Sequence, residues 1–281
     1  FDEVQKSCLT RGVRITGSEL VGLIPLKAML DAGKHYLKKQ GRSLGVSEEE
    51  LIHIADKSMG LDELGPFDPN KKIIEYQLKN ESDEHLINLT AKNLAQETAS
   101  ESMAPGGGSI SAYVGSLGIS LGTMVANLSA NKPGWEEKLN TFSDWAEIGQ
   151  SIQKELLFLV NEDTRSFNQI IDAIRMAKDT EQEKKLRSEA IQNASKYAAE
   201  VPFKVMETSY KSLELLSAML KIGNPASMSD TGVGALCCLT AIEGAYMNVR
   251  INTKDINDKS FAENLNQEAI KLMSDAKKNL G

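Results

Sequence analysis

From Glu81 to its end, the chain carries only the apolar periodicity of helices. Apolar residues recur there at spacings of three and four, and Pro, Gly and Asn separate the periodic stretches. Helices are expected at about residues 83–98, 108–130, 134–140, 144–176, 181–222, 230–251 and 260–280. A kink is expected at Pro202, which has no N–H for a helical hydrogen bond. Long helices joined by short connections form bundles, so residues 81–281 are predicted to be a mainly α, long-helix bundle.

The first part of the chain has a different pattern. A short helix at 4–8 precedes an apolar, β-branched run at 13–24, Pro25 begins a second helix, and Ser47 with Glu50 has capping-box spacing for a third. Residues 65–80 interrupt these patterns and are interpreted as a linker. One strand or hairpin cannot form a sheet alone, so residues 1–64 are expected to be an incomplete α+β unit, the end of a larger domain. Because the chain opens on Phe1 inside a helical pattern, an upstream part of the natural polypeptide is expected to be missing.

Composition narrows the function classes. A net charge of −7 argues against nucleic acid or an anionic membrane as the main partner. The three cysteines show no CxxC spacing, so no metal site is expected and a reduced, cytoplasmic compartment fits best. The uncharged stretch 103–131 contains six Gly and five Ser. It is therefore predicted to be a closely packed buried helix, and no membrane span is expected.

One carboxylate stands out on the helix expected at 144–176. Asp163 falls in a seam with Leu156, Leu159 and Phe167. Burial there would raise its pKa toward the range useful for proton transfer. An ion pair with a Lys or Arg on a neighbouring helix is an equally good interpretation of this position. Glu162 points more to the side and is expected to be a solvated surface residue.

Two helix starts offer further candidate groups. Pro105, Gly106, Gly107, Gly108 and Ser109 precede an apolar helix, where backbone N–H groups and missing side chains could receive a flat ring or a carbonyl. A flexible connection is the alternative. Asp230 opens another small-residue helix, where it could cap the helix or act as a second carboxylate beside Asp163. The histidines at 35, 53 and 85 are not expected to form a catalytic triad or a ligand set.

These stretches together resemble a known family. Residues 15–25, ITGSELVGLIP, and the GPF of residues 65–67 resemble the end of a glutamate formimidoyltransferase domain and its linker. The segments APGGGS at 104–109, MVANL at 124–128, EDTRSFN at 162–168 and NVRIN at 248–252 are similar, in that order, to formimidoyltetrahydrofolate cyclodeaminases.

The resemblance implies a helical, dimer-forming domain that converts 5-formimidoyltetrahydrofolate to 5,10-methenyltetrahydrofolate and releases ammonia in histidine degradation. It implies catalysis by Asp163, with Asp230 carried over from a looser match, and substrate binding by residues 105–109. A folate partner, a homodimer or higher homo-oligomer, and no metal or redox cofactor are expected. Two other functions stay open: a methenyltetrahydrofolate cyclohydrolase, and a non-catalytic folate-binding or oligomerisation module.

Overall fold

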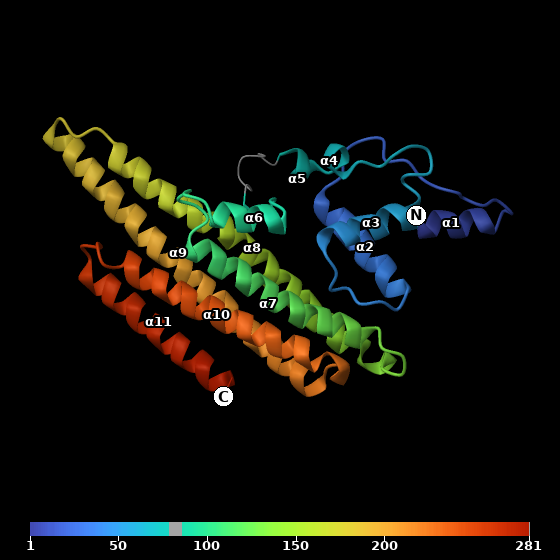
Figure 1. Ribbon diagram of the computed structural model, residues 1–281. Coiled ribbons are helices and arrows are strands. Elements are labelled where there is room, and N and C mark those ends of the chain that lie inside the picture. Colours follow the sequence, from blue (N-terminus) through green and yellow to red (C-terminus); the bar gives the residue numbers. More distant parts are fainter. Residues whose placement is uncertain (79–85, 281) are drawn as a thin grey trace.

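The computed structural model describes residues 1–78 and 86–280 of the chain and is built from helices (Figure 1). Five helices form the bundle: α7 (Gly107–Ala130), α8 (Leu139–Arg175), α9 (Glu181–Ile222), α10 (Met228–Asn252) and α11 (Lys259–Leu280). A short helix, α6 (Ala91–Thr98), lies beside them, and 3-10 turns at Glu136–Lys138 and Pro225–Ser227 precede α8 and α10. The mainly α, long-helix bundle predicted from the periodicity is confirmed.

The bundle is held together by close contacts around α7. A Cβ at Gly118 would lie 2.7 Å from the Cys238 sulfur of α10, and one at Gly122 would lie 2.6 Å from Leu215 of α9. On the α8 side, a Cβ at Gly149 would lie 2.0 Å from Thr123 Oγ1. These glycines let α8, α9 and α10 pack closely against α7, so the small residues of the uncharged stretch serve packing as predicted.

Local signals place the ends of the longest helices. Thr180 caps α9 and forms a capping box with Glu183, which satisfies N–H groups that the first turn leaves unpaired. Pro202 lies inside α9, yet the helix continues from Glu181 to Ile222 as one element. The helix expected at 134–140 is only the 3-10 turn Glu136–Lys138, and α8 begins directly after it at Leu139. Part of the helix expected at 83–98 lies outside the described residues.

The N-terminal unit, residues 1–78, is also helical. It contains α1 (Asp2–Leu9), α2 (Leu26–Lys39), α3 (Glu48–Met59), α4 (Pro69–Lys72) and α5 (Ile74–Gln77). Ser47 caps α3 through its side chain, and Gly60 ends it with a φ of 60°, both at the positions the sequence indicates. A small separate core joins Met29, Ile52, Ala55 and Ile73, so residues 69–77 of the expected linker pack onto this unit.

The strand expected at 13–24 is not present among the described residues. An isolated parallel bridge between Ile24 and Ile73 is the β pairing that this run makes there. Val13, Val21 and Leu23 are more than half exposed, so these side chains do not pack into the core of the unit. The physical reason is that an extended segment without neighbouring strands has no ladder to join.

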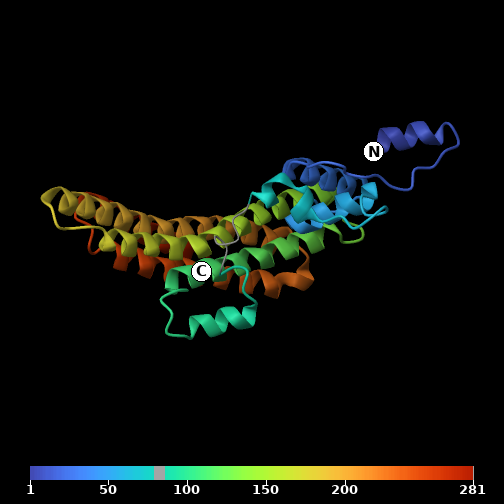
Figure 2. The same cartoon turned by 90° about the horizontal axis from the view of Figure 1, so that it is seen from above.

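The N-terminal unit docks on the bundle through the loop before α3. The carbonyl of Gly45 accepts hydrogen bonds from Asn127 of α7 at 2.8 Å and from Gln150 of α8 at 3.3 Å. Leu44 N donates to Ser143 Oγ of α8 at 2.8 Å. A Cβ at Gly45 would lie 2.1 Å from that of Ala146, so only glycine fits there. Seen from above, α1 projects away from this contact and α6 lies to one side of the bundle (Figure 2).

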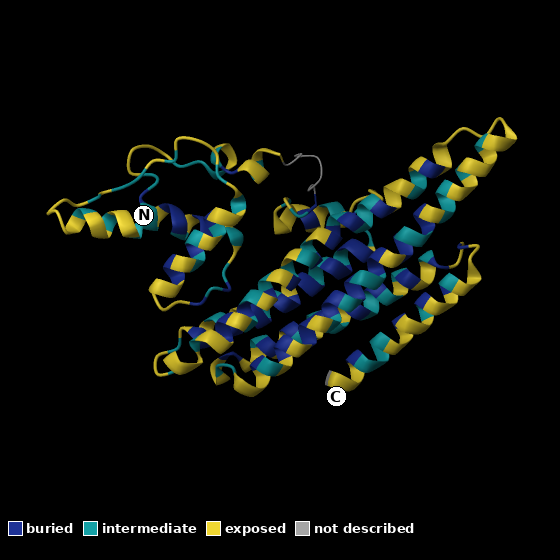
Figure 3. Cartoon of the chain, turned by 180° about the vertical axis from the view of Figure 1, so that it is seen from behind, coloured by how far each residue is buried: buried dark blue, intermediate teal, exposed yellow. Residues whose placement is uncertain are grey.

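Two bundle segments are long and apolar enough to cross a membrane by length and composition: α7 and residues 225–252, each with a mean hydropathy of 1.3. In α7, 61% of the apolar window is buried, as in a core helix of a bundle. The second segment has only 33% of its window buried. Seen from behind, buried residues gather in the middle of the bundle and exposed ones lie toward its ends and outer sides (Figure 3). The outward side of α10 is therefore the larger apolar surface.

Candidate functional site

Three segments that are distant in sequence meet at the N-terminus of α7. Asp163, in the second half of α8, lies directly against Gly108, where an added Cβ would stand 2.1 Å from Asp163 Oδ1. Asn248, near the end of α10, lies over Gly107 with its Nδ2 3.3 Å from an added Cβ. The structure thus brings the glycine loop, the α8 carboxylate and the NVRIN segment to one place.

Ser109 holds the carboxylate of Asp163. Its backbone N–H donates to Asp163 Oδ2 at 2.8 Å, and its hydroxyl donates to the same oxygen at 2.9 Å. The Thr164 hydroxyl lies 3.3 Å from the Ser109 hydroxyl. Ser109 stands in the first turn of α7, so the helix end also places partial positive charge beside the carboxylate. Asp163 is therefore held in one orientation, with Oδ1 turned toward the glycine loop.

Burial raises the pKa of Asp163 above its ordinary value of 3.8, and the two hydrogen bonds from Ser109 oppose this shift without cancelling it. No ion pair with Asp163 is present among the described residues. The equally weighted interpretation of Asp163 as the partner of a Lys or Arg thus finds no support in the described part of the chain. A half-buried carboxyl with a raised pKa, fixed at a helix N-terminus, can both accept and donate a proton.

The five loop residues differ in what they contribute. Pro105, Gly108 and Ser109 are buried, whereas Gly107 is exposed. Gly106 is the N-cap of α7 and has no atom within 4 Å of an added Cβ. Close approach therefore requires a glycine at 108, and Gly106 and Gly107 leave the surface open beside Asn248.

Asp230 lies at the other end of the bundle. It is in the first turn of α10, and Asn248 follows 18 residues later on the same helix. At 1.5 Å per residue, they are about 27 Å apart along the helix axis. The N-cap position belongs to Ser227, not to Asp230. Within one chain the structure does not bring Asp230 to Asp163, and a catalytic role for Asp230 stays a prediction.

Glu162 was expected at the surface, and this expectation is wrong. Its side chain is buried, with 4% of the residue exposed. It accepts a hydrogen bond from Tyr197 of α9 and pairs with Arg165 at 2.6 Å. Burial together with Glu162 raises the pKa of Tyr197 to about 12, so the phenol stays protonated as a donor.

The expectation failed because the buried face of α8 contains other residues than the apolar spacing through Asp163 indicates. The buried face runs through Leu159, Glu162, Ser166 and Ala173, while Phe167 and Ile174 are 38% and 46% exposed. The spacing of three and four fits this series as well as the one through Asp163. Tyr197 stands in no sequence segment with a functional signal, so its contact with Glu162 could not be predicted.

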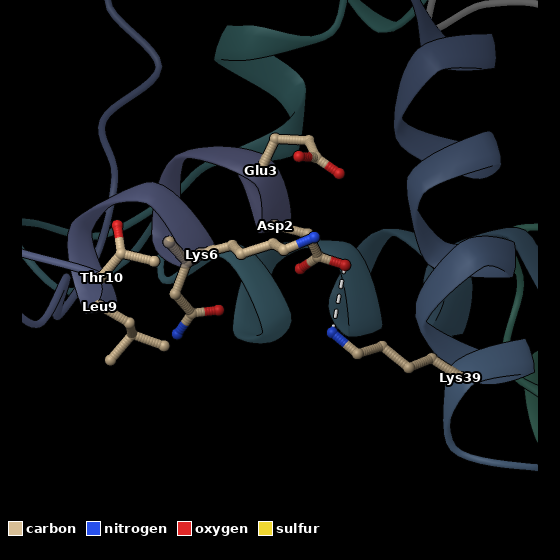
Figure 4. Close-up of a pocket in the computed structure, with 7 residues that line it drawn as sticks. Asp2, Glu3, Lys6, Leu9, Thr10 and Lys39 are labelled. Carbon is tan, nitrogen blue, oxygen red and sulfur yellow. Dashed lines mark hydrogen bonds and ion pairs between the residues drawn. The ribbon is translucent and has the colours of Figure 1, made fainter.

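A hollow in the surface lies far from this site, between α1 and α2. It has a volume of about 570 Å³ and is lined by Asp2, Lys6, Thr10 and Lys39, among others (Figure 4). Asp2 accepts hydrogen bonds from His35 and Lys39, which lower its pKa to about 2. A carboxylate fully ionised at neutral pH and already paired is a poor proton carrier, so this hollow is not the candidate site.

Comparison with known proteins identifies the same family that the sequence segments resemble. A family model described as "Formiminotransferase-cyclodeaminase" matches residues 90–271, and one described as "Formiminotransferase domain" matches residues 1–79. A mouse protein named formimidoyltransferase-cyclodeaminase is 34% identical over 278 residues, which is 99% of this chain and 51% of the mouse protein. The chain therefore spans about half the length of the curated relatives it matches first.

Two further proteins match about two thirds of this chain. A methenyltetrahydrofolate cyclohydrolase from Methylorubrum extorquens is 29% identical over 189 residues, 67% of this chain and 91% of that protein. The crystal structure of a formiminotetrahydrofolate cyclodeaminase from Thermotoga maritima superposes with a TM-score of 0.60 at 26% identity. The superposition covers 70% of this chain and 96% of that one.

Proposed function

The chain belongs to the formiminotransferase-cyclodeaminase family, and on this premise we propose that its helical bundle is a formimidoyltetrahydrofolate cyclodeaminase. The reaction converts 5-formimidoyltetrahydrofolate to 5,10-methenyltetrahydrofolate and ammonia. The observation that carries the proposal is Asp163, held by Ser109 at the N-terminus of α7 with a raised pKa. The glycine loop beside it is the proposed place of the folate, in agreement with the expectation for residues 105–109.

The chemistry requires one group that moves a proton twice. N10 of the folate attacks the carbon of the formimidoyl group, and a new C–N bond forms. The proton on N10 must leave, and the amino group on the same carbon must gain a proton before the C–N bond to ammonia breaks. A carboxylate that takes the first proton and delivers it to the departing nitrogen closes this cycle without a redox step or a net change in its own state.

Asp163 has the properties that this cycle needs. Ser109 fixes Oδ2 through two hydrogen bonds, which leaves Oδ1 on the side of Gly108 for exchange of a proton with substrate. The positive charge of a protonated formimidoyl group would be attracted by the carboxylate. Because the pKa of Asp163 is raised, its protonated form is a usable fraction nearer neutral pH than for an ordinary aspartate. The proposed catalytic residue is therefore Asp163.

A methenyltetrahydrofolate cyclohydrolase is the second candidate function. It is favoured by the relative from Methylorubrum extorquens, which carries that name and matches 67% of this chain. The same carboxylate could activate water for attack on a methenyl carbon. Five curated relatives that match nearly the whole chain carry the name formimidoyltransferase-cyclodeaminase, so the deaminase is the first choice.

A two-substrate assay separates the candidates. The purified protein is incubated with 5-formimidoyltetrahydrofolate, and ammonia and the absorbance of 5,10-methenyltetrahydrofolate are followed together. In parallel, 5,10-methenyltetrahydrofolate is supplied and its loss is followed. The proposal predicts equal amounts of ammonia and methenyl product in the first reaction. Hydrolysis in the second reaction without ammonia release in the first would establish the cyclohydrolase, and inactivity in both would leave a non-catalytic module.

The proposed assembly is a homodimer or a larger homo-oligomer. Val233, Leu236 and Met247 expose 51%, 64% and 68% of their surface along α10. The adjacent helix α7 exposes Leu117, Met124 and Leu128. Apolar surface repeated along two packed helices is typical of an interface, and a second copy of the same face would cover it. We propose the cytoplasm as the place of the reaction and no metal or redox cofactor for it.

A further inference from the structure

An acidic pocket lies in the N-terminal unit, near the contact of this unit with α8. It has a volume of about 500 Å³ and opens between α3 and the segment that follows it. Glu48, Glu49, His53 and Asp56 of α3 line one side, and Phe67 and Tyr76 line the other. None of these residues takes part in the Asp163 site, so the pocket needs a separate explanation.

Asp56 is the unusual group in this pocket. Only 8% of the residue is exposed, and its Oδ1 is buried without a hydrogen-bond partner. A buried carboxylate oxygen that loses its water without gaining a donor destabilises the fold. Asp56 lines the pocket, so its carboxylate is placed to accept hydrogen bonds from a bound group.

The neighbouring charges do not supply that donor. Glu48 is already engaged, because Tyr76 donates to it at 2.8 Å and Lys154 of α8 pairs with it at 3.0 Å. Lys57, the residue after Asp56, pairs with Asp62 instead. The residues that line the pocket include no lysine or arginine. The pocket therefore has an excess of negative charge on one wall and apolar or aromatic surface from Ile52 and Phe67 beside it.

We propose that this pocket binds a small, planar organic cation of the amidinium or guanidinium type. Two N–H groups of such a cation match the two oxygens of a carboxylate, and its flat face packs on aromatic and apolar side chains. Within the residues that the structure describes, no group of three or more His, Cys, Asp or Glu side chains is arranged to hold a metal ion. An organic cation also uses the apolar wall, which a metal ion would leave empty.

Binding of a cation should also change the protonation of Asp56, which is a second measurable effect. Burial, and next the nearby charge of Asp62, raise the pKa of Asp56 above its ordinary value of 3.8. A bound cation favours the ionised carboxylate, so binding releases protons at pH values near the raised pKa.

Benzamidine is a direct probe, because benzamide has the same shape without the charge. The full chain is titrated with each compound while the ring signals of its histidines are followed by NMR. Benzamidine should shift the His53 signal, bind with a Kd on the order of 1 mM or lower, and leave the His35 signal in place. Benzamide should shift neither signal. Absence of benzamidine binding at millimolar concentration, or equal binding of benzamide, would overturn the proposal.

Three variants locate the binding. Asp56→Asn keeps the shape and removes the charge, so it should weaken benzamidine binding at least ~10-fold. Glu49→Gln changes an exposed carboxylate at the rim, and it gives a smaller loss even where Asp56→Asn fails to fold. Asp31→Asn removes a charge from an exposed pair with Lys27 on α2 and serves as the matched control with unchanged binding. Binding that survives in both Asp56→Asn and Glu49→Gln would refute the assignment to this pocket.

Discussion

A methyl group at Gly108 should inactivate the proposed cyclodeaminase without unfolding it. The Cβ of an alanine there would lie 2.1 Å from Asp163 Oδ1 and 2.6 Å from Asp163 Cγ. Ordinary van der Waals contact begins at 3.4 Å, so the carboxylate must move by about 1.3 Å. A shift of this size away from Ser109 would stretch its hydrogen bonds of 2.8 and 2.9 Å to roughly 4 Å, beyond hydrogen-bonding distance.

The expected magnitude follows from the displacement. Misplacement of a reacting group by about 1 Å can cost ~100-fold in rate, so Gly108→Ala should lower kcat/KM by about two powers of ten, or ~2.7 kcal/mol of transition-state stabilisation. The melting temperature should change little, because alanine favours helix over glycine by up to ~1 kcal/mol and partly offsets the lost hydrogen bonds.

Gly232→Ala is the matched control for this substitution. Gly232 is a glycine of helix α10 outside the loop at residues 105–109, and no atom stands within 4 Å of its added Cβ. The assay is ammonia release from 5-formimidoyltetrahydrofolate, together with thermal unfolding of each variant. Gly232→Ala should retain activity close to that of the unsubstituted protein. Full activity in Gly108→Ala, or an equal loss in Gly232→Ala, would refute the assigned role of the contact between Gly108 and Asp163.

Three further predictions test other parts of the account. Gly45→Ala should loosen the docking of the N-terminal unit, because its Cβ would lie 2.1 Å from that of Ala146; hydrogen exchange of residues 43–48 should accelerate, while Gly65→Ala, with open space around it, should leave exchange unchanged. The protein with Asp163 should lose stability as pH rises above 3.8, because its folded state keeps the Asp163 proton to higher pH than its unfolded state does. Asp163→Asn lacks this proton, so its free energy of unfolding should increase relative to that of the unsubstituted protein over the same range. Urea unfolding of both proteins between about pH 4 and 8 measures the difference, and a constant difference would contradict the raised pKa. Leu236→Glu places a charge on a residue that is 64% exposed along α10 and should reduce the mass measured by light scattering, whereas an unchanged protein that is monomeric at micromolar concentration would refute the proposed interface.

Helix existence and most helix ends in the bundle are predictable because their signals are local. Thr180 with Glu183, Ser47 with Glu50, and the αL glycine at 60 act within one turn of the helix that they begin or end. The segment 13–24 illustrates the opposite case. Its apolar, β-branched residues favour a strand, but a strand exists only if other segments pair with it, and among the described residues Ile73 alone provides a bridge.

The site also has features that local sequence predicts and features that only contacts between helices determine. A carboxylate in the α8 seam and a glycine loop at a helix start are visible in the sequence, and the structure brings Asp163 and Gly108 into contact. Which of two consecutive acids faces the core is not visible, because Glu162 and Asp163 both continue an apolar spacing of three and four. Contacts between helices determine which acid is buried. Tyr197 of α9 donates a hydrogen bond to Glu162, and Ser109 of α7 donates one to Asp163. Packing also decides that the Asn248 end of α10, and not the Asp230 end, lies at this site.

The most direct test of the central claim is ammonia release by Asp163→Asn. The substitution keeps the volume of the side chain and an oxygen that can accept from Ser109, and it removes the group that carries the proton. We expect kcat for ammonia release from 5-formimidoyltetrahydrofolate to fall at least ~100-fold while circular dichroism and the melting temperature show an intact helical bundle. Turnover close to that of the unchanged protein, in a folded Asp163→Asn variant, would contradict the claim that Asp163 moves the protons of the reaction.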